Sequence, residues 1–221
     1  MRSFGGRATQ FQRINRVRPP RAPAAVFPAV PAVVYTESFN KADGSLGPDL
    51  TWVVGAAANA AVESNRAVND GSDPAVFATA RAEHDTSSPN MYVQADIAVA
   101  DDFNDIVILV GRCGDTASLD SDVGVYMQID GAANPTLTNV AIADLDDDDP
   151  FDNYQAAGID MVATWRLELD GNEGRAYRNG VLLLTSDITA ITATGTRAGF
   201  ILSDVTASPR CAIDNFEYGD L

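Results

Sequence analysis

From Val34 onward, apolar residues recur at every second position, and this alternation restricts the fold more than any other feature of the chain. Residues 91–99, 123–129 and 165–169 each place apolar side chains on one face and mostly polar side chains on the other. Successive side chains of a β-strand point to opposite faces, so this period is typical of half-buried antiparallel strands. Shorter candidate strands are 51–54, 75–81, 106–111, 137–143, 175–184, 196–202 and 210–217.

Dipeptides that favour tight turns separate these candidate strands. They are Asp43-Gly44, Asp70-Gly71, Asp130-Gly131, Asp170-Gly171 and Asn179-Gly180. Asn, Asp and Gly tolerate the positive φ angles that two-residue hairpin turns require. Many short strands with regular turns predict an all-β, two-sheet antiparallel jelly-roll sandwich over residues 35–221.

Residues 1–34 differ in composition and predict an extended N-terminal arm. Five of the eleven prolines of the chain lie between Pro19 and Pro31. Because proline fixes φ and has no amide donor, neither a helix nor a central strand persists here, and polyproline II is expected. Two alternatives stay open, namely a disordered tail and a signal peptide. A signal peptide needs an uninterrupted apolar stretch of about 7–15 residues, which the prolines break.

Charge is distributed unevenly between the arm and the rest of the chain. Residues 1–36 contain six arginines and no acid, whereas residues 37–221 carry a net charge of -22, which gives -16 for the whole chain. A body of this charge repels nucleic acid and anionic membranes. No apolar run approaches the roughly 20 residues of a membrane helix, so no membrane insertion is expected.

The arginines and aromatic residues of the arm predict that it docks onto a partner. Arginine donates paired hydrogen bonds to carboxylates, so the acidic body of another copy is a suitable acceptor. The candidate partner-binding residues are Arg2, Phe4, Arg7, Phe11, Arg13, Arg16, Arg18, Arg21 and Phe27.

Few residues are available for metal or thiol chemistry. The chain has one histidine, His84, and two cysteines, Cys113 and Cys211, so the usual zinc sites are excluded by count. Both cysteines lie in strand-like segments, which predicts buried structural thiols. A disulfide between them and a Cys-His pair that meets in space stay open.

An acidic segment, 144–152, contains the candidate calcium ligands Asp146, Asp148, Asp149 and Asp152. Calcium takes 6–8 oxygen ligands, but the spacing here is not that of a calcium-binding loop. Pro150 is expected to prevent a strand. We therefore predict a solvated acidic loop, with a calcium site or a docking surface for a basic segment as alternatives, and no other cofactor.

Three segments carry a resemblance to a known family. They are ESFNKADGSLGPDLTW (37–52), WRLELDGNEGRAYRNGVLLL (165–184) and CAIDNFEYGDL (211–221). Over residues 35–221 the chain resembles the concanavalin A-like, laminin-G-like jelly rolls of tailed-bacteriophage virion proteins. In that family the opening segment pairs near the closing one.

This resemblance implies a structural virion protein, assembled in the host cytoplasm, and above all a minor tail protein. The arm would then bind other virion proteins and copies of the chain itself, and the exposed jelly roll would contact host glycans. A capsid-decorating protein and a non-catalytic carbohydrate-binding module are the alternatives.

One motif also resembles an enzyme signature. Glu168, Asp170 and Glu173 fit the E-x-D-x-x-E pattern of a jelly-roll glycoside hydrolase family, in which two carboxylates about 5–5.5 Å apart cleave the sugar linkage. Gly171-Asn172 has the composition of a turn, which would take Glu173 off the strand. The prediction is therefore a solvated hairpin edge and a protein that is not an enzyme.

Overall fold

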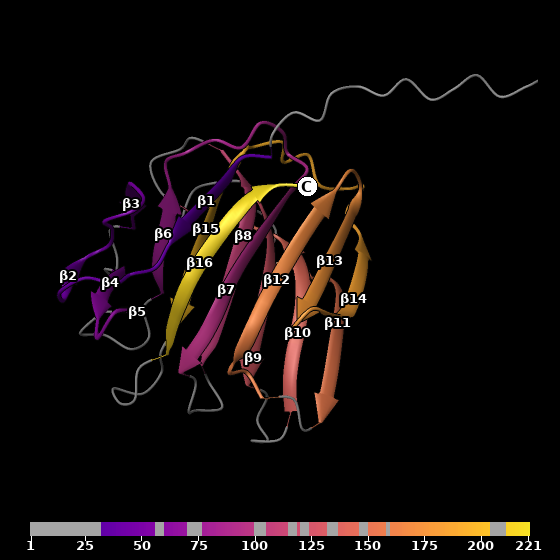
Figure 1. Ribbon diagram of the computed structural model, residues 1–221. Helices are drawn as coiled ribbons and strands as arrows, with labels where there is room; N and C mark the ends of the chain where they lie inside the picture. Colours follow the sequence, from indigo (N-terminus) through magenta and orange to yellow (C-terminus); the bar gives the residue numbers. More distant parts are fainter. Residues whose placement is uncertain are drawn as a thin grey trace, which may run out of the picture. The chain divides into compact units, whose positions relative to one another are not determined.

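The computed structural model describes residues 32–55, 60–69, 77–99, 105–114, 119, 124–131, 137–145, 150–157, 160–203 and 211–221. These residues form sixteen β-strands, and no α-helix occurs among them. The strands make two antiparallel sheets that stack as the layers of a sandwich (Figure 1). The predicted all-β, two-sheet sandwich is thereby confirmed.

The first sheet, called sheet A, has nine strands. Its order is β14 (Val181–Asp187), β13 (Glu173–Arg178), β12 (Ala163–Asp170), β7 (Met91–Val99), β16 (Ala212–Asp220), β5 (Arg66–Asn69), β4 (Ala60–Glu63) and β2 (Gly44–Ser45), and β1 (Val34–Glu37) also pairs with β16.

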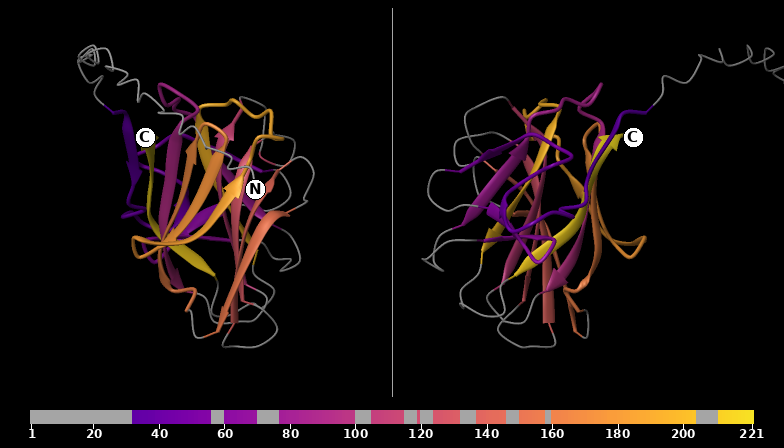
Figure 2. Two further views of the ribbon diagram at one scale, coloured as in Figure 1. Left: turned by 90° about the vertical axis from the view of Figure 1, so that its right-hand side faces the viewer. Right: turned by 60° about the vertical axis from the view of Figure 1, so that its left-hand side comes forward.

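The second sheet, called sheet B, has seven strands. Its order is β11 (Pro150–Ala157), β10 (Leu137–Asp144), β9 (Val125–Gly131), β8 (Ile106–Cys113), β15 (Arg197–Ser203), β6 (Ala78–Ala82) and β3 (Trp52–Val54). Figure 2 shows the two layers from the side, with the turn between β13 and β14 projecting from the sandwich.

The core lies between the sheets and follows the alternation of the sequence. In β12, Trp165, Leu167 and Leu169 are completely buried, whereas Arg166 and Glu168 lie on the outer face. Burial of the inward faces of the strands removes a large apolar area from water, which is the main term that stabilises such a sandwich.

The opening and closing segments lie side by side, as the resemblance implied. Strand β1 pairs with β16, with Glu37 opposite Phe216. The buried Glu37 carboxylate accepts hydrogen bonds from the backbone amides of Phe39 (3.1 Å) and Leu50 (3.0 Å), and from Trp52 Nε1 (3.3 Å). These motif residues therefore stabilise the fold.

Two of the predicted turns are confirmed within residues 165–184, one between β12 and β13 and one between β13 and β14. Gly171 has a φ of 57°, and Asn179 and Gly180 have φ values of 48° and 75°. Two other dipeptides are not turns, since Asp130 and Gly131 end β9 and Gly44 begins β2. The Asp70-Gly71 dipeptide lies outside the described residues.

The structure corrects two expectations about strands. Pro150 begins β11 instead of preventing a strand, because the first position of an edge strand needs no ladder donor from proline. The apolar run Val181–Leu184 also predicts a strand that is buried on both faces or lies at an interface. In the single chain Val181 and Leu182 are exposed, so burial on both faces is wrong and the interface stays a prediction. Strands β2, β4 and β5 were not predicted.

Candidate functional site

Most predicted site residues lie outside the described part of the chain. This holds for all nine candidate residues of the arm and for Asp146, Asp148 and Asp149, while Asp152 is described only by its backbone position in β11. Arm docking and calcium binding therefore stay predictions. Within the described ranges, no three or more His, Cys, Asp or Glu side chains come together as a metal site would require.

The carboxylates of the enzyme-like motif surround one guanidinium. Arg175 Nη1 lies 3.8 Å from Glu168 Oε2, and its Nη2 lies 3.8 Å from Asp170 Oδ2. The turn at Gly171 places Glu173 on β13, opposite Asp170, where it also pairs with Arg175. A hydrogen bond to Glu173 raises the pKa of Arg175. Ion pairing therefore accounts for the clustering of the three acids.

A second arginine, Arg166 on β12, lies on the outer face of sheet A. The guanidinium carbon of Arg166 is 3.9 Å from the centroid of the Tyr92 ring, and Arg166 Nε donates to Glu168 Oε1 at 2.8 Å. Tyr92 in turn donates its hydroxyl to Glu217 Oε1 at 2.6 Å. These residues, with Tyr177 on β13, are called the Arg166 face.

The contacts of Arg166 orient its guanidinium and leave donors available. Stacking on Tyr92 covers one face of the planar guanidinium, and the hydrogen bond to Glu168 uses its Nε–H. No described residue accepts a hydrogen bond from its two terminal nitrogens, and 29% of the side chain is exposed. An arginine held in this way presents a fixed fork of N–H donors to a ligand.

The tyrosine hydroxyls of the Arg166 face stay protonated. Burial raises the pKa of Tyr92, and its hydrogen bond to Glu217 raises it further. Burial also raises the pKa of Tyr177, followed by the hydrogen bond to Glu168. Both phenols are therefore hydrogen-bond donors at neutral pH, beside carboxylates that accept.

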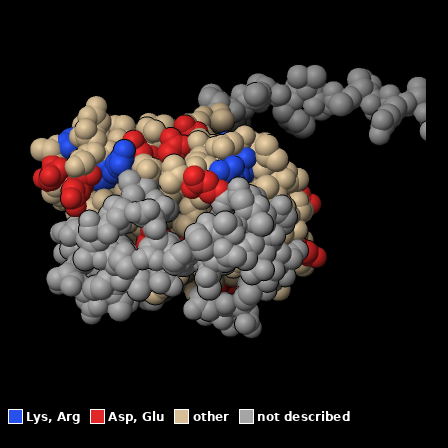
Figure 3. All heavy atoms as spheres, turned by 90° about the horizontal axis from the view of Figure 1, so that it is seen from below, with Lys and Arg blue, Asp and Glu red and all other residues tan. Residues whose placement is uncertain are grey.

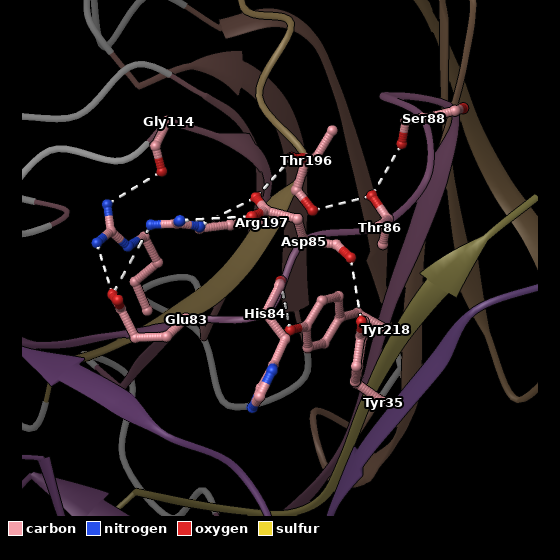
Figure 4. Close-up of polar contacts among 11 residues, drawn as sticks. Tyr35, Glu83, His84, Asp85, Thr86, Ser88, Gly114, Thr196, Arg197 and Tyr218 are labelled. Carbon is pink, nitrogen blue, oxygen red and sulfur yellow. Dashed lines mark hydrogen bonds and ion pairs between the residues drawn. The ribbon is translucent and has the colours of Figure 1, made fainter.

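A separate polar network joins the loop before β7 to the start of β15 (Figure 4). The Asp85 carboxylate accepts from Thr196 Oγ1 at 2.7 Å and from Arg197 Nε at 3.1 Å. These two bonds, that of Thr196 first, lower the pKa of Asp85. The His84 ring stacks on Tyr35 with centroids 5.1 Å apart, so the lone histidine packs against β1.

Asp220 holds the residue immediately before β1. Its Oδ2 accepts from the Val33 amide at 3.0 Å and from Ser87 Oγ at 2.7 Å. Burial alone would raise the pKa of Asp220, but the hydrogen bonds from Val33 and Ser87 outweigh it and lower the pKa. The sequence did not predict these hydrogen bonds of Asp220, because residues 33, 87 and 220 are far apart in the chain.

The two cysteines are buried, as predicted. Cys113 and Cys211 are both completely buried, and no disulfide joins them.

On the described part of the face seen in Figure 3, acidic and basic side chains lie beside one another rather than in separate patches. Among the described residues, no helix has the length and apolar character needed to cross a bilayer.

Comparison with known proteins identifies the fold of the chain. No family model and no curated protein matches the chain. The endo-β-1,3(4)-glucanase SCLam of family GH16 is 12% identical over 87% of this chain and 93% of its own, with a TM-score of 0.57. The carbohydrate recognition domain of Emp47p is 12% identical over 84% and 93%, with a TM-score of 0.54.

The carbohydrate-binding module CBM66 of Bacillus subtilis is 15% identical over 78% of this chain and 94% of its own, with a TM-score of 0.50. At these identities the likeness shows a concanavalin A-like or galectin-like sandwich. The same fold occurs in binding modules, lectins and glucanases, so it does not by itself separate binding from catalysis.

Proposed function

We propose that the jelly roll is a non-catalytic carbohydrate-binding module that holds a neutral glycan on the Arg166 face. One observation carries the proposal. Arg166 is fixed by Tyr92 and Glu168, yet its two terminal nitrogens have no acceptor among the described residues. Preorganised donors of this kind bind a ligand without paying the full ordering entropy of a long side chain.

The surroundings of Arg166 favour a sugar over an anion. Sugar hydroxyls both donate and accept hydrogen bonds, and the face offers the terminal nitrogens of Arg166 as donors next to the carboxylates of Glu168 and Glu217 as acceptors. Those carboxylates would repel a uronic acid or a phosphate. The occurrence of the same sandwich in CBM66 and in the Emp47p recognition domain supports this proposal by analogy of fold.

Catalysis is the less favoured function of the same strands. Hydrolysis needs one carboxyl that gives a proton and another that attacks or activates water. Here Glu168, Asp170 and Glu173 all contact Arg175, and Glu168 also binds Arg166. We therefore expect Glu168→Gln to change the affinity for a glycan. We do not expect this variant to abolish a measurable cleavage of β-glucan by the parent chain.

Glycan binding is tested by the purified full chain on an array of neutral and uronic acid-containing glycans, followed by calorimetry with the best ligand. Arg166→Gln should weaken binding about tenfold or more, since a charge-assisted donor pair is lost. Arg66→Gln, on β5, is the matched control and should bind like the parent chain. Equal affinity of the Arg166→Gln and parent chains would exclude this face.

A second candidate function concerns the whole chain and is compatible with the first. We propose a structural virion protein of a tailed phage, above all a minor tail protein, anchored by residues 1–34. Two features support this proposal: the opposite charges of the arm and the body, and the resemblance of segments 37–52 and 211–221 to the jelly rolls of phage virion proteins. A capsid-decorating protein is the alternative location.

Deletion of residues 1–31 tests the anchor, because the described core begins at residue 32. The truncated protein should stay folded and soluble and be missing from purified particles. Particles that carry it at the normal copy number would show that the jelly roll, rather than the arm, attaches the protein.

A further inference from the structure

Strand β14 forms an open edge of sheet A and exposes apolar side chains. It pairs with β13 on one side, and no described strand pairs with its other side. Val181 is 62% exposed and Leu182 is 49% exposed. The strand, VLLLTSD, contains no lysine or proline, which are the residues that commonly protect such an edge.

An open strand edge is most fully satisfied by another strand. Its outward N–H and C=O groups form a row that an added strand can pair, and the exposed leucine and valine would be covered at the same time. Strand β11 of the same chain lies near β14 without pairing with it, so it does not supply this partner.

We propose that β14 pairs antiparallel with β14 of a second copy of this chain across a two-fold axis. The same surface then serves both copies, as a two-fold interface requires. The two sheets A would continue into one another, and the Val181 and Leu182 side chains of both copies would be removed from water.

Charges at the two ends of the strand favour this partner. Arg178 lies opposite Val181 at the start of β14, and the exposed Asp187 ends the strand. Arg178 lies on β13, one strand in from the edge. An antiparallel arrangement centred on Leu184 sets Val181 opposite the partner's Asp187, so the long Arg178 side chain would reach across Val181 toward that carboxylate, and symmetry repeats the pair. Hydrogen bonds from Thr189 lower the pKa of Asp187, so its carboxylate is ionised at neutral pH.

The interface is small, so the dimer is expected to dissociate on dilution. Stable interfaces bury roughly 1,200–2,000 Å² in total, and one pair of seven-residue strands with two exposed apolar side chains each supplies less. Sedimentation velocity of the full chain should show a monomer–dimer equilibrium with a dissociation constant on the order of micromolar.

Leu182→Glu places a carboxylate near each end of the proposed interface, beside the partner's Asp187, and should leave a monomer at every concentration. Val162→Glu is the matched control, because Val162 is 42% exposed but precedes β12. Far-UV circular dichroism checks that both variants fold. A parent chain that stays monomeric at about 200 µM, or a dimer that survives Leu182→Glu, overturns the proposal.

A charge exchange tests the orientation of the strands. Arg178→Asp and Asp187→Arg should each weaken the dimer about tenfold, because each puts like charges together at both ends. The double variant should recover the parent affinity. If the double variant is as weak as the single variants while its melting temperature is unchanged, the antiparallel pairing is wrong.

Discussion

At the scale of single residues, buried and partly buried carboxylates decide how the ends of the chain are held. Glu37 accepts hydrogen bonds from four groups, and Asp220 joins Val33 to Ser87. Neither acid takes part in the proposed glycan site. An acid in a family motif is therefore not by itself a functional residue, because a buried carboxylate with several donors is also an efficient structural cap.

Glu37→Ala should lower the free energy of unfolding by about 3 kcal/mol or more, because several buried donors lose their acceptor. Glu37→Gln should fall between this variant and the parent chain, since the amide keeps one acceptor oxygen. Urea denaturation measures both. Thr36→Ala, at an exposed position of the same strand, is the control, and a Glu37→Ala chain of parent stability would contradict this role.

Stability should fall when the solution is acidified below about pH 4. The pKa values of Asp85 and Asp220 are lowered in the folded chain. The stabilisation is therefore complete above the pKa of the unfolded chain and is lost as the pH falls through the lower folded value. Urea denaturation between pH 6 and pH 3 should show a shallower decline for Asp220→Asn than for the parent chain; parallel curves would refute the assignment.

At the scale of elements, the alternation predicted the long strands because one face of each is buried. The bounds of β12 lie close to the predicted ones. Those of β8 do so as well, although β8 is buried on both faces and was predicted from its apolar run. Strands β4 and β5 escaped prediction, because they have four residues each and turn at Ser64-Asn65 rather than at a glycine. Strand β11 escaped because Pro150 suggested a loop.

The candidate site was only partly predictable. The spacing of Glu168, Asp170 and Glu173 drew attention to the hairpin whose first strand carries Arg166. The Arg166 face itself joins Tyr92, Arg166 and Glu217, which come from three strands and meet only through the order β12-β7-β16. No local pattern encodes that order, so the sequence alone could not show that Arg166 is stacked and fixed.

The pairing of β1 with β16 depends on a close backbone approach at Gly219. A Cβ there would lie 2.3 Å from the Val33 carbonyl oxygen and 3.1 Å from Val34 Cα. Gly219→Ala should therefore displace β1 and cost more than about 2 kcal/mol. Gly180→Ala, whose Cβ would meet open space but at a φ of 75°, should cost only about 1 kcal/mol. Thermal and urea unfolding compare them, and equal losses would contradict the close approach.

At the scale of the whole molecule, the features discussed above lie on different surfaces of the sandwich. The interior between the two sheets stabilises the fold, the outer face of sheet A presents Arg166, and no described strand pairs with the outer side of β14. If β14 pairs as proposed, two Arg166 faces would belong to one continuous sheet. Weak binding at each site would then be strengthened by simultaneous attachment to a polymeric glycan.

The most direct measurement is a nuclear magnetic resonance titration of the ¹⁵N-labelled full chain with the best neutral glycan from the array. The Arg166 Nε–H resonance and the amides of Tyr92 and Tyr177 should shift together, with one affinity, and Arg166→Gln should remove these shifts. Shifts confined instead to Gln128 and Asn139, on the outer face of sheet B, would contradict the account by placing the glycan on the opposite layer of the sandwich.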